Sequence, residues 1–250
     1  MNILTRTNIA SFTLPLLLAA CGGGNSYNSN REPLPTEPPD EPQPTLVSFS
    51  VEVANVTANQ PLAPLALVLH NGDYNAWQIG EPASTGLEML AESGDPTAFI
   101  DEAQSAYSTM TGSGILVPGA KASYEISAML DSESLSRDDL SLTLASMPVN
   151  TNDAFTGSSG LPLSLLAAGE SLQRLLPIYD AGTEANTETA ATVPGPAAGG
   201  TGFSEERDDI ADRVTRHPGV VTAADGYGES ALDSSHRFDQ GAILVTITRN

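Results

Sequence analysis

The chain has 250 residues, with 31 Asp or Glu against 10 Lys or Arg, which gives a formal net charge of −21. That charge excludes ordinary nucleic-acid binding, because phosphates would be repelled rather than neutralised. The single cysteine excludes an internal disulfide framework and a cysteine-based zinc site. Hydrophobic residues make up 40 % of the chain, which is enough for a packed core, and the length allows one large domain or two small ones.

The first twenty residues have the pattern of a secretory signal peptide. Arg6 supplies a positive charge, and the apolar run over residues 12–20 is shorter than the ~20 apolar residues of a membrane-spanning helix. A Leu-Ala-Ala sequence directly before Cys21 resembles the lipobox of bacterial lipoproteins, in which the cysteine is lipidated and becomes the new N-terminus. The alternative is an ordinary signal peptide with a free cysteine nearby. We expect residues 1–20 to be removed and Cys21 to carry a lipid anchor.

A tether follows the cysteine. In Gram-negative lipoproteins an Asp at the next position usually signals retention in the inner membrane, and Gly22 stands there, so the resemblance implies the outer membrane. After Cys21, residues 22–45 begin with Gly, Asn and Ser and then alternate Pro with Glu and Asp, without apolar periodicity. Such a chain favours extended polyproline II, at ~3.1 Å per residue. We therefore expect a disordered tether and a folded domain over residues 46–250.

Most of the remaining chain has the pattern of β-strands. Apolar and polar residues alternate with a period of two in residues 46–53, 121–130, 140–144 and 242–249. Residues 65–70 are apolar almost throughout and predict a more fully buried strand. Residues 172–179 predict a further strand, in which Pro177 would lie at an edge or an end.

Residues 87–110 differ, because their apolar positions recur at helical spacing. These positions are Leu87, Leu90, Ala91, Phe99, Ile100, Ala103 and Tyr107. Asp95 and Pro96 match an N-cap followed by the first helical residue. We expect one or two short helices inserted into an all-β fold, an antiparallel β-sandwich with strands at both ends of the domain.

The motifs of common catalytic sites are missing from the sequence. It contains no Gly-x-Ser-x-Gly elbow, no phosphate-binding glycine loop and no His-Glu-x-x-His helix. His70, His217 and His236 are too far apart in the chain to form a local pair. His70 ends an apolar strand, and we expect it to be a structural residue. An enzyme is therefore the minor hypothesis.

Two segments rich in oxygen donors are the strongest candidates for a binding site. The first spans residues 147–157 and contains Asp153, and the second spans residues 179–188 and contains Asp180 and Glu184. Carboxylates, amides and accessible carbonyls suit a hard divalent cation, above all Ca²⁺, which takes 6–8 oxygen ligands. An acid four positions after another, across an Ala-Gly-Thr turn, can fold back onto the same ion. Asp and Asn are also ordinary turn residues, so two solvated turns are the alternative.

The same segments resemble the spondin N-terminal domain family. The motifs are Asn-Asp-Ala-Phe-Thr-Gly at residues 152–157 and Tyr-Asp-Ala-Gly-Thr-Glu at residues 179–184. The resemblance implies a β-sandwich similar to C2 domains, with Ca²⁺ held in loops at one end by Asp153, Asp180 and Glu184. The animal pattern has an Asp where Glu184 stands, and its cysteine pair has no counterpart in this sequence. Animal members of the family act in adhesion at the cell surface and the extracellular matrix.

Together these features predict an outer-membrane lipoprotein that binds Ca²⁺ and serves in adhesion or binding. Its contact with the membrane would be the lipid on Cys21, and its ligand an extracellular protein or a glycan. The first alternative is a periplasmic or surface metal-dependent hydrolase with a carboxylate base at the metal. The second is a purely structural protein of the envelope. The hydrolase predicts an open coordination position beside a deep pocket, whereas the binding module predicts a full ligand shell and an exposed patch.

Overall fold

The computed structural model describes residues 42–207 and 211–250, so the predicted signal peptide, Cys21 and most of the tether lie outside the described residues. The strands are β1 (Thr45–Asn55), β2 (Ala66–His70), β3 (Ser108–Thr111), β4 (Lys121–Leu130), β5 (Ser141–Ser146), β6 (Ala154–Pro162), β7 (Ser171–Asp180), β8 (Thr215–Arg216) and β9 (Gly241–Arg249). The helices are α1 (Thr85–Ser93), α2 (Thr97–Asp101) and α3 (Ser132–Ser136), with two short 3₁₀ turns at Ala223–Asp225 and Ser234–His236. The first strand thus begins at the last residue of the predicted tether, one residue before the predicted start of the domain. None of the helices in the described residues has the length and apolar character to cross a membrane.

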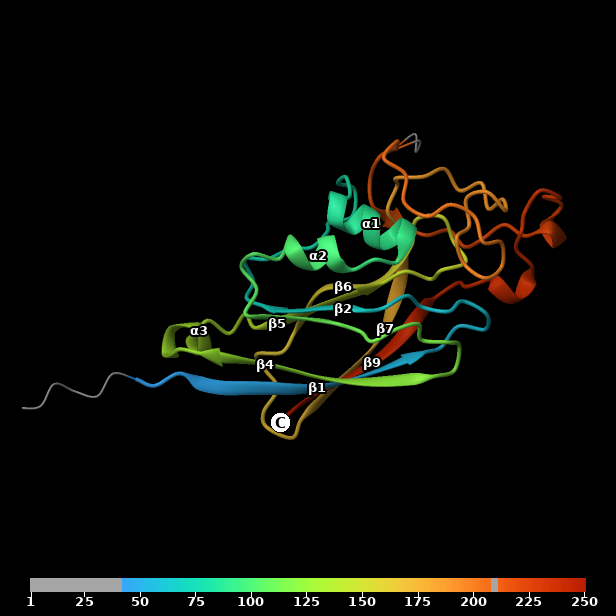
Figure 1. The fold of residues 1–250 in the computed structure, drawn as a ribbon. Coiled ribbons are helices and arrows are strands. Elements are labelled where there is room, and N and C mark those ends of the chain that lie inside the picture. The colour runs from blue at the N-terminus through green and yellow to red at the C-terminus, as the bar shows by residue number, and fades with distance from the viewer. Residues whose placement is uncertain (1–41, 208–210) are drawn as a thin grey trace, which may run out of the picture. The chain divides into compact units, whose positions relative to one another are not determined.

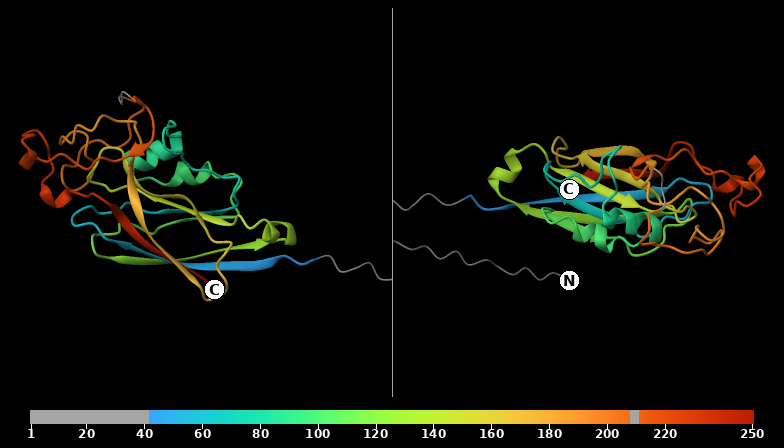
Figure 2. Two further views of the ribbon diagram at one scale, coloured as in Figure 1. Left: turned by 180° about the vertical axis from the view of Figure 1, so that it is seen from behind. Right: turned by 90° about the horizontal axis from the view of Figure 1, so that it is seen from above.

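The strands form two layers that are joined through β7. Hydrogen-bonded neighbours follow the order β3-β2-β5-β6-β7-β9-β1-β4, and every pair is antiparallel. The first part of β7 pairs with β9, and its last residues pair with β6, so this strand belongs to both layers. Figure 1 shows the layer of β1 and β4 facing the layer of β2, β5 and β6, and the turned views in Figure 2 show the same two layers. The predicted antiparallel β-sandwich is confirmed.

The prediction that Pro177 lies at an edge or an end of its strand is wrong. It lies inside β7, where the register shifts between Leu176 and Pro177 as the strand changes partner from β9 to β6. A proline has no N–H to give to a ladder, so it is tolerated where a register shift interrupts the pairing. The hydroxyl of Thr156 on β6 donates to the Pro177 carbonyl at 3.0 Å. The proline therefore marks the crossing between the two layers.

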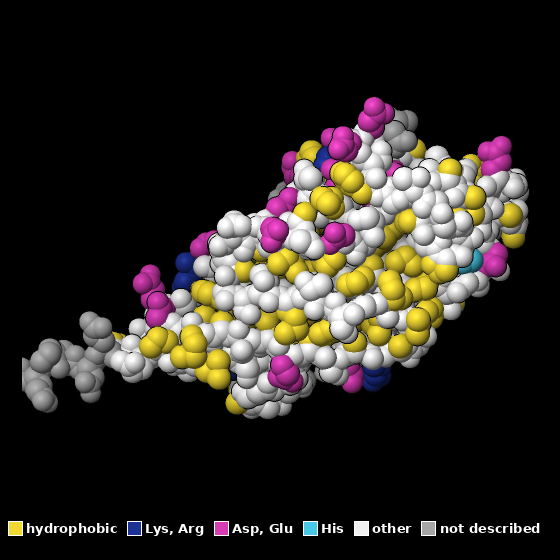
Figure 3. Space-filling view, in the orientation of Figure 1, with side chains coloured by type: hydrophobic (Ala, Val, Ile, Leu, Met, Phe, Trp, Pro, Cys, Tyr) yellow, Lys and Arg dark blue, Asp and Glu magenta, His cyan; other side chains and the backbone are white. Residues whose placement is uncertain are grey.

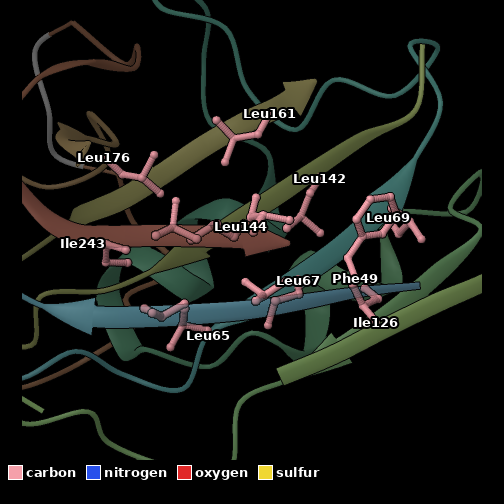
Figure 4. Close-up of a cluster of buried hydrophobic side chains, with 14 of the residues drawn as sticks. Phe49, Leu65, Leu67, Leu69, Ile126, Leu142, Leu144, Leu161, Leu176 and Ile243 are labelled. Atoms are coloured by element: carbon pink, nitrogen blue, oxygen red, sulfur yellow. The ribbon is translucent and has the colours of Figure 1, made fainter. Parts of the chain in front are cut away.

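The main apolar core fills the space between the layers. β1 buries Val47, Phe49, Val51 and Val53 in turn, and the residues between them stay partly exposed, as the period-two pattern predicts. Figure 4 shows side chains from both layers meeting in this core; those labelled are Phe49, Leu65, Leu67, Leu69, Ile126, Leu142, Leu144, Leu161, Leu176 and Ile243. Apolar burial of this kind contributes about 25 cal/mol per Å² of area removed from water.

A second apolar cluster lies on the outer face of the layer that contains β2. Leu67 and Leu69 of β2 belong to the main core, whereas Ala66 and Val68 belong to the cluster that includes Leu90 of α1 and Phe99 of α2. Figure 1 shows α1 and α2 lying over this layer. Because both of its faces are covered, β2 is buried along its whole length, as its continuous apolar sequence predicts.

The segment predicted to be helical contains two helices and one strand. Ser84 caps α1 by accepting the Leu87 N–H, and Gly94 ends it in the left-handed conformation at φ 72°. The N-cap of α2 is Pro96 rather than Asp95, whose carboxylate instead accepts the Thr97 N–H at 2.9 Å. The last residues of the segment lie in β3, and α3 was not predicted. The expectation of short helices inserted between strands is correct. The two helices end at Asp101, however, whereas the helical spacing of apolar residues continues to residue 107.

Candidate functional site

The two segments predicted to bind a cation meet where β6 begins and β7 ends. Ala154, the first residue of β6, pairs with Asp180, the last residue of β7. The N–H of Ala181 donates to the carbonyl of Asp153 at 3.1 Å. Strand pairing therefore places Asp153 beside Asp180, although they are 27 positions apart in the sequence. The first predicted loop is shorter than expected, because residues from Ala154 onward belong to β6.

Asp153 has no exposed surface and is held by three hydrogen bonds. Its Oδ2 accepts the backbone N–H groups of Thr183 at 2.9 Å and Glu184 at 3.1 Å. Its Oδ1 accepts the side-chain N–H of Asn152 at 3.1 Å. The carboxylate of the first loop thus holds the main chain of the second loop in place.

Asp180 organises the turn that follows it. Its Oδ1 accepts the Gly182 N–H at 2.8 Å, and its Oδ2 accepts the Asn186 side-chain N–H at 2.6 Å. Gly182 has a φ of +71°, and a Cβ at this position would lie 2.3 Å from the carbonyl oxygen of Arg213. The glycine of the Ala-Gly-Thr turn is therefore required for the close approach to Arg213 and for the left-handed turn. This turn places the backbone N–H groups of Thr183 and Glu184 within hydrogen-bond distance of the Asp153 carboxylate.

The electrostatics of the site favour the uptake of positive charge. Burial and the neighbouring Asp180 carboxylate raise the pKa of Asp153 from 3.8 to about 7, although the N–H groups of Glu184 and Thr183 act in the opposite direction. Glu92 raises this pKa further. Two adjacent buried carboxylates cannot both stay ionised at low cost unless a proton or a cation offsets their repulsion.

Sequence reasoning missed Glu92, which lies near the end of α1. Its side chain is 1 % exposed, burial raises its pKa, and its Oε2 accepts the Ser204 N–H at 2.8 Å. The Thr183 hydroxyl lowers that pKa, yet neither Glu92 Oε1 nor Thr183 Oγ1 has a hydrogen-bond partner of normal geometry among the described residues. Such orphaned buried oxygens are rare. The available signal was the four-residue spacing of Glu88 and Glu92, each next to an apolar position of the helix.

The other buried acid of α1 has a different environment. Glu88 Oε2 lies 2.5 Å from Nη2 of Arg207, so its charge is neutralised. Glu92, one turn later, forms no ion pair within the described residues. Of the two helix acids, Glu92 is the one with negative charge left to offset.

The predicted ligands are therefore brought together to different degrees. Asp153 and Asp180 are neighbours. The backbone N–H of Glu184 donates to Asp153, and the side-chain Oε2 of Glu184 is also buried. Carboxylate oxygens together with the orphaned oxygens of Glu92 and Thr183 match the donors of a hard cation. Among the residues that the structure describes, no group of three or more His, Cys, Asp or Glu side chains is already arranged to hold a metal ion.

His70, which the sequence predicts to be a structural residue, is buried at the end of β2. It is 1 % exposed, and its Nε2 lies 2.9 Å from the Thr143 hydroxyl on β5. Its Nδ1 lies 2.5 Å from the carbonyl oxygen of Asn71. Both ring nitrogens are thus occupied within the protein.

No family model and no curated protein matches this chain. The spondin resemblance therefore stays a prediction that depends on its motif residues.

Proposed function

We propose that the protein is an outer-membrane lipoprotein whose β-sandwich binds one Ca²⁺ at the junction of β6 and β7 and serves as a surface adhesion or binding module. The observation that carries the proposal is the buried pair of Asp153 and Asp180, with the pKa of Asp153 raised to about 7. Two carboxylates buried side by side repel each other, and a bound cation would reduce that repulsion.

Asp153, Asp180 and Glu184 would hold the ion, as the spondin resemblance implies, with Glu92 and Thr183 as additional oxygen donors. The ion would supply the positive charge that allows these carboxylates to ionise together. Its role would be structural, because the residues involved come from α1 and from the loops next to β6 and β7. These segments are brought together only in the folded chain, so the ion stabilises the folded state over the unfolded one.

The anchor and the location rest on the sequence. The Leu-Ala-Ala-Cys21 motif supports lipidation, and Gly22 supports the outer membrane. A domain that begins at Thr45 leaves the acidic, proline-rich segment before it as a tether. The adhesive role, with an extracellular protein or a glycan as ligand, rests on the spondin resemblance.

The hydrolase alternative has less support. A catalytic carboxylate must reach a substrate, whereas Asp153 is 0 % exposed and both of its oxygens already accept hydrogen bonds. A buried, hydrogen-bonded carboxylate suits a structural ion better than a general base.

The proposal is tested by thermal unfolding of the mature chain with excess EDTA or with Ca²⁺. Calcium at a hundredfold excess over Kd should stabilise the parent protein by about 2.7 kcal/mol and raise its melting temperature. Asp180→Asn, which removes one charge from the site, should lose most of this rise. Asp101→Asn, at an exposed acid ending α2, should keep it. The same rise in both variants, or no rise in the parent, would refute the site.

A further inference from the structure

Two adjoining hollows lie between the segment after β8 and the segment before β9. The larger, of about 420 Å³, is lined by Pro218, Gly219, Val220, Arg237, Phe238 and Asp239. The smaller, of about 270 Å³, is lined by Ile178, Arg216, His217, Phe238, Asp239 and Gln240. Phe238 and Asp239 line both, so the two hollows adjoin and are taken together as one candidate site. The volume of the larger hollow is within the range of small-molecule sites, about 300–1,000 Å³.

Arg216 supplies a positive charge that the described residues do not neutralise. Its guanidinium lies 4.9 Å from the centre of the Tyr179 ring, and that ring is stacked on Phe155 at 5.2 Å. No ion pair joins Arg216 to any acid in residues 42–207 and 211–250. This cation–π contact uses the charge of the guanidinium and not its N–H donors, which can bind a carboxylate in a bidentate manner.

His217 adds a buried donor to the wall of the smaller hollow. Its Nδ1 accepts the Gly219 N–H at 3.0 Å, so the proton of the neutral ring lies on Nε2. Burial lowers the pKa of His217 to about 4, which keeps the ring neutral at pH 7. Nε2 is buried and has no hydrogen-bond partner among the described residues. Because buried donors are almost always paired, this N–H lacks an acceptor that a ligand can supply.

The remaining wall provides an apolar surface and a rim of mixed charge. The Phe238 ring meets the His217 ring at a centroid distance of 5.0 Å, and Ile178 and Val220 are buried. Among the described lining residues, Asp239 is the one acid, against Arg216 and Arg237. Arg237 is paired with Asp225, so Arg216 is the cation available to a ligand. The chain has a net charge of −21, but the lining of these hollows has more positively than negatively charged side chains.

We propose that these hollows bind a small carboxylic acid with a ring-shaped body. The carboxylate binds the edge of the Arg216 guanidinium and accepts the Nε2–H of His217, while the ring lies against Phe238. Only one negative charge is accommodated, because Asp239 and the acidic protein repel a second. The site is separate from the proposed cation site, whose carboxylates are not among its lining residues.

The test is a calorimetric titration of the full mature chain in EDTA, which keeps the result independent of calcium. The probes are glucuronic acid and cyclohexanecarboxylic acid, which distinguish a sugar ring from an apolar ring, each beside its uncharged methyl ester. We expect one of the acids to bind and its ester to bind about tenfold more weakly or worse. Arg216→Gln should weaken acid binding by a similar factor, and His217→Phe, which keeps a flat ring but removes the donor, should weaken it severalfold.

Arg174→Gln is the matched control, because Arg174 is an exposed arginine on β7 outside both hollows. This variant should bind the acid like the parent. Three results would overturn the proposal: neither acid binds the parent at millimolar concentration, acid and ester bind equally, or Arg216→Gln and Arg174→Gln have the same affinity. Circular dichroism of each variant confirms that a loss of binding is not a loss of fold.

Discussion

Asp153 combines full burial, three hydrogen bonds and a raised pKa, and these properties have one physical origin. The chain places its carboxylate beside that of Asp180 and near Glu92, in a region from which water is excluded. The backbone N–H groups of Thr183 and Glu184 favour the ionised form, but burial and the neighbouring acids outweigh them. In the absence of a cation, a proton on Asp153 is the remaining way to reduce the repulsion.

This argument predicts a pH dependence of stability in EDTA. The pKa of Asp153 is raised from 3.8 to about 7 on folding, so the folded state holds its proton over a range in which the unfolded chain has lost it. The contribution of Asp153 to stability is then fully present below pH ~4, is lost as the pH rises towards 7, and changes no further above it. His217, whose pKa burial lowers to about 4, contributes in the opposite direction, so the Asp153 contribution is measured by urea unfolding of the parent and of Asp153→Asn at several pH values.

Asp153→Asn imitates the protonated side chain and should show a smaller fall between pH ~4 and ~7 than the parent. Glu188, whose pKa is also raised to about 7 by burial, contributes a fall of the same sign that this variant retains. Identical pH profiles for the parent and Asp153→Asn would show that Asp153 is ionised throughout, contrary to this account.

The candidate site was predictable from the sequence only in part. Asp153 and Asp180 could be found because each lies in a short motif next to a strand. Glu92 could not, because it reaches the site from α1, about 60 residues before Asp153 in the chain, and local patterns do not report which helix face meets which loop. His217 was also missed as a site residue, since its lack of a partner depends on the position of Gly219 and Phe238.

At the level of whole elements, alternation identified the strands that bury one face. β1, β4 and β9 show the predicted pattern because each has one face in the main core. β6 escaped prediction, because its sequence is rich in Gly and Ser and has no period of two. It becomes a strand through its neighbours β5 and β7, and this is a tertiary effect that overrides local propensity. The position of Pro177 was mispredicted for a similar reason, because the sequence does not show that β7 pairs with strands of both layers.

Gly157 allows β6 to approach β5, and its replacement tests this close contact. A Cβ at this position would lie 2.1 Å from the carbonyl oxygen of Leu144, so the two strands would have to separate. We expect Gly157→Ala to lower the free energy of unfolding by about 1–3 kcal/mol or more, as overpacked core substitutions do. Chemical denaturation measures the change.

Gly114→Ala is the control for that substitution. A Cβ at Gly114 meets no atom within 4 Å, and its φ lies outside the left-handed range. The stability of this variant should stay within about 0.5 kcal/mol of the parent. If Gly157→Ala proved equally harmless, the close approach of β5 and β6 would be wrong.

At the scale of the whole molecule, an acidic domain follows a proposed lipid anchor and tether. Figure 3 shows Asp and Glu side chains spread over the visible face, with few Lys or Arg between them. Such a surface opposes self-association and close binding to anionic lipid. Under the proposed function, membrane attachment would therefore depend on the lipid at Cys21 rather than on the domain.

The expected consequence is that Cys21→Ser releases the protein from membranes. The serine cannot be acylated, and no helix in the described residues can replace the anchor. Fractionation of cells that express either chain measures the distribution, with the parent in the outer-membrane fraction and the variant in the soluble fraction. A variant that still sediments with membranes would contradict the lipid anchor.

The central proposal is that the buried carboxylates at the junction of β6 and β7 bind a cation. It is tested most directly by calorimetric titration of Ca²⁺ into the purified mature chain after removal of metals with EDTA. The account predicts one ion bound per chain, with proton release at neutral pH, because Asp153 with its pKa of about 7 must give up its proton to the ion. Absence of binding at millimolar Ca²⁺, or binding without proton release, would contradict it.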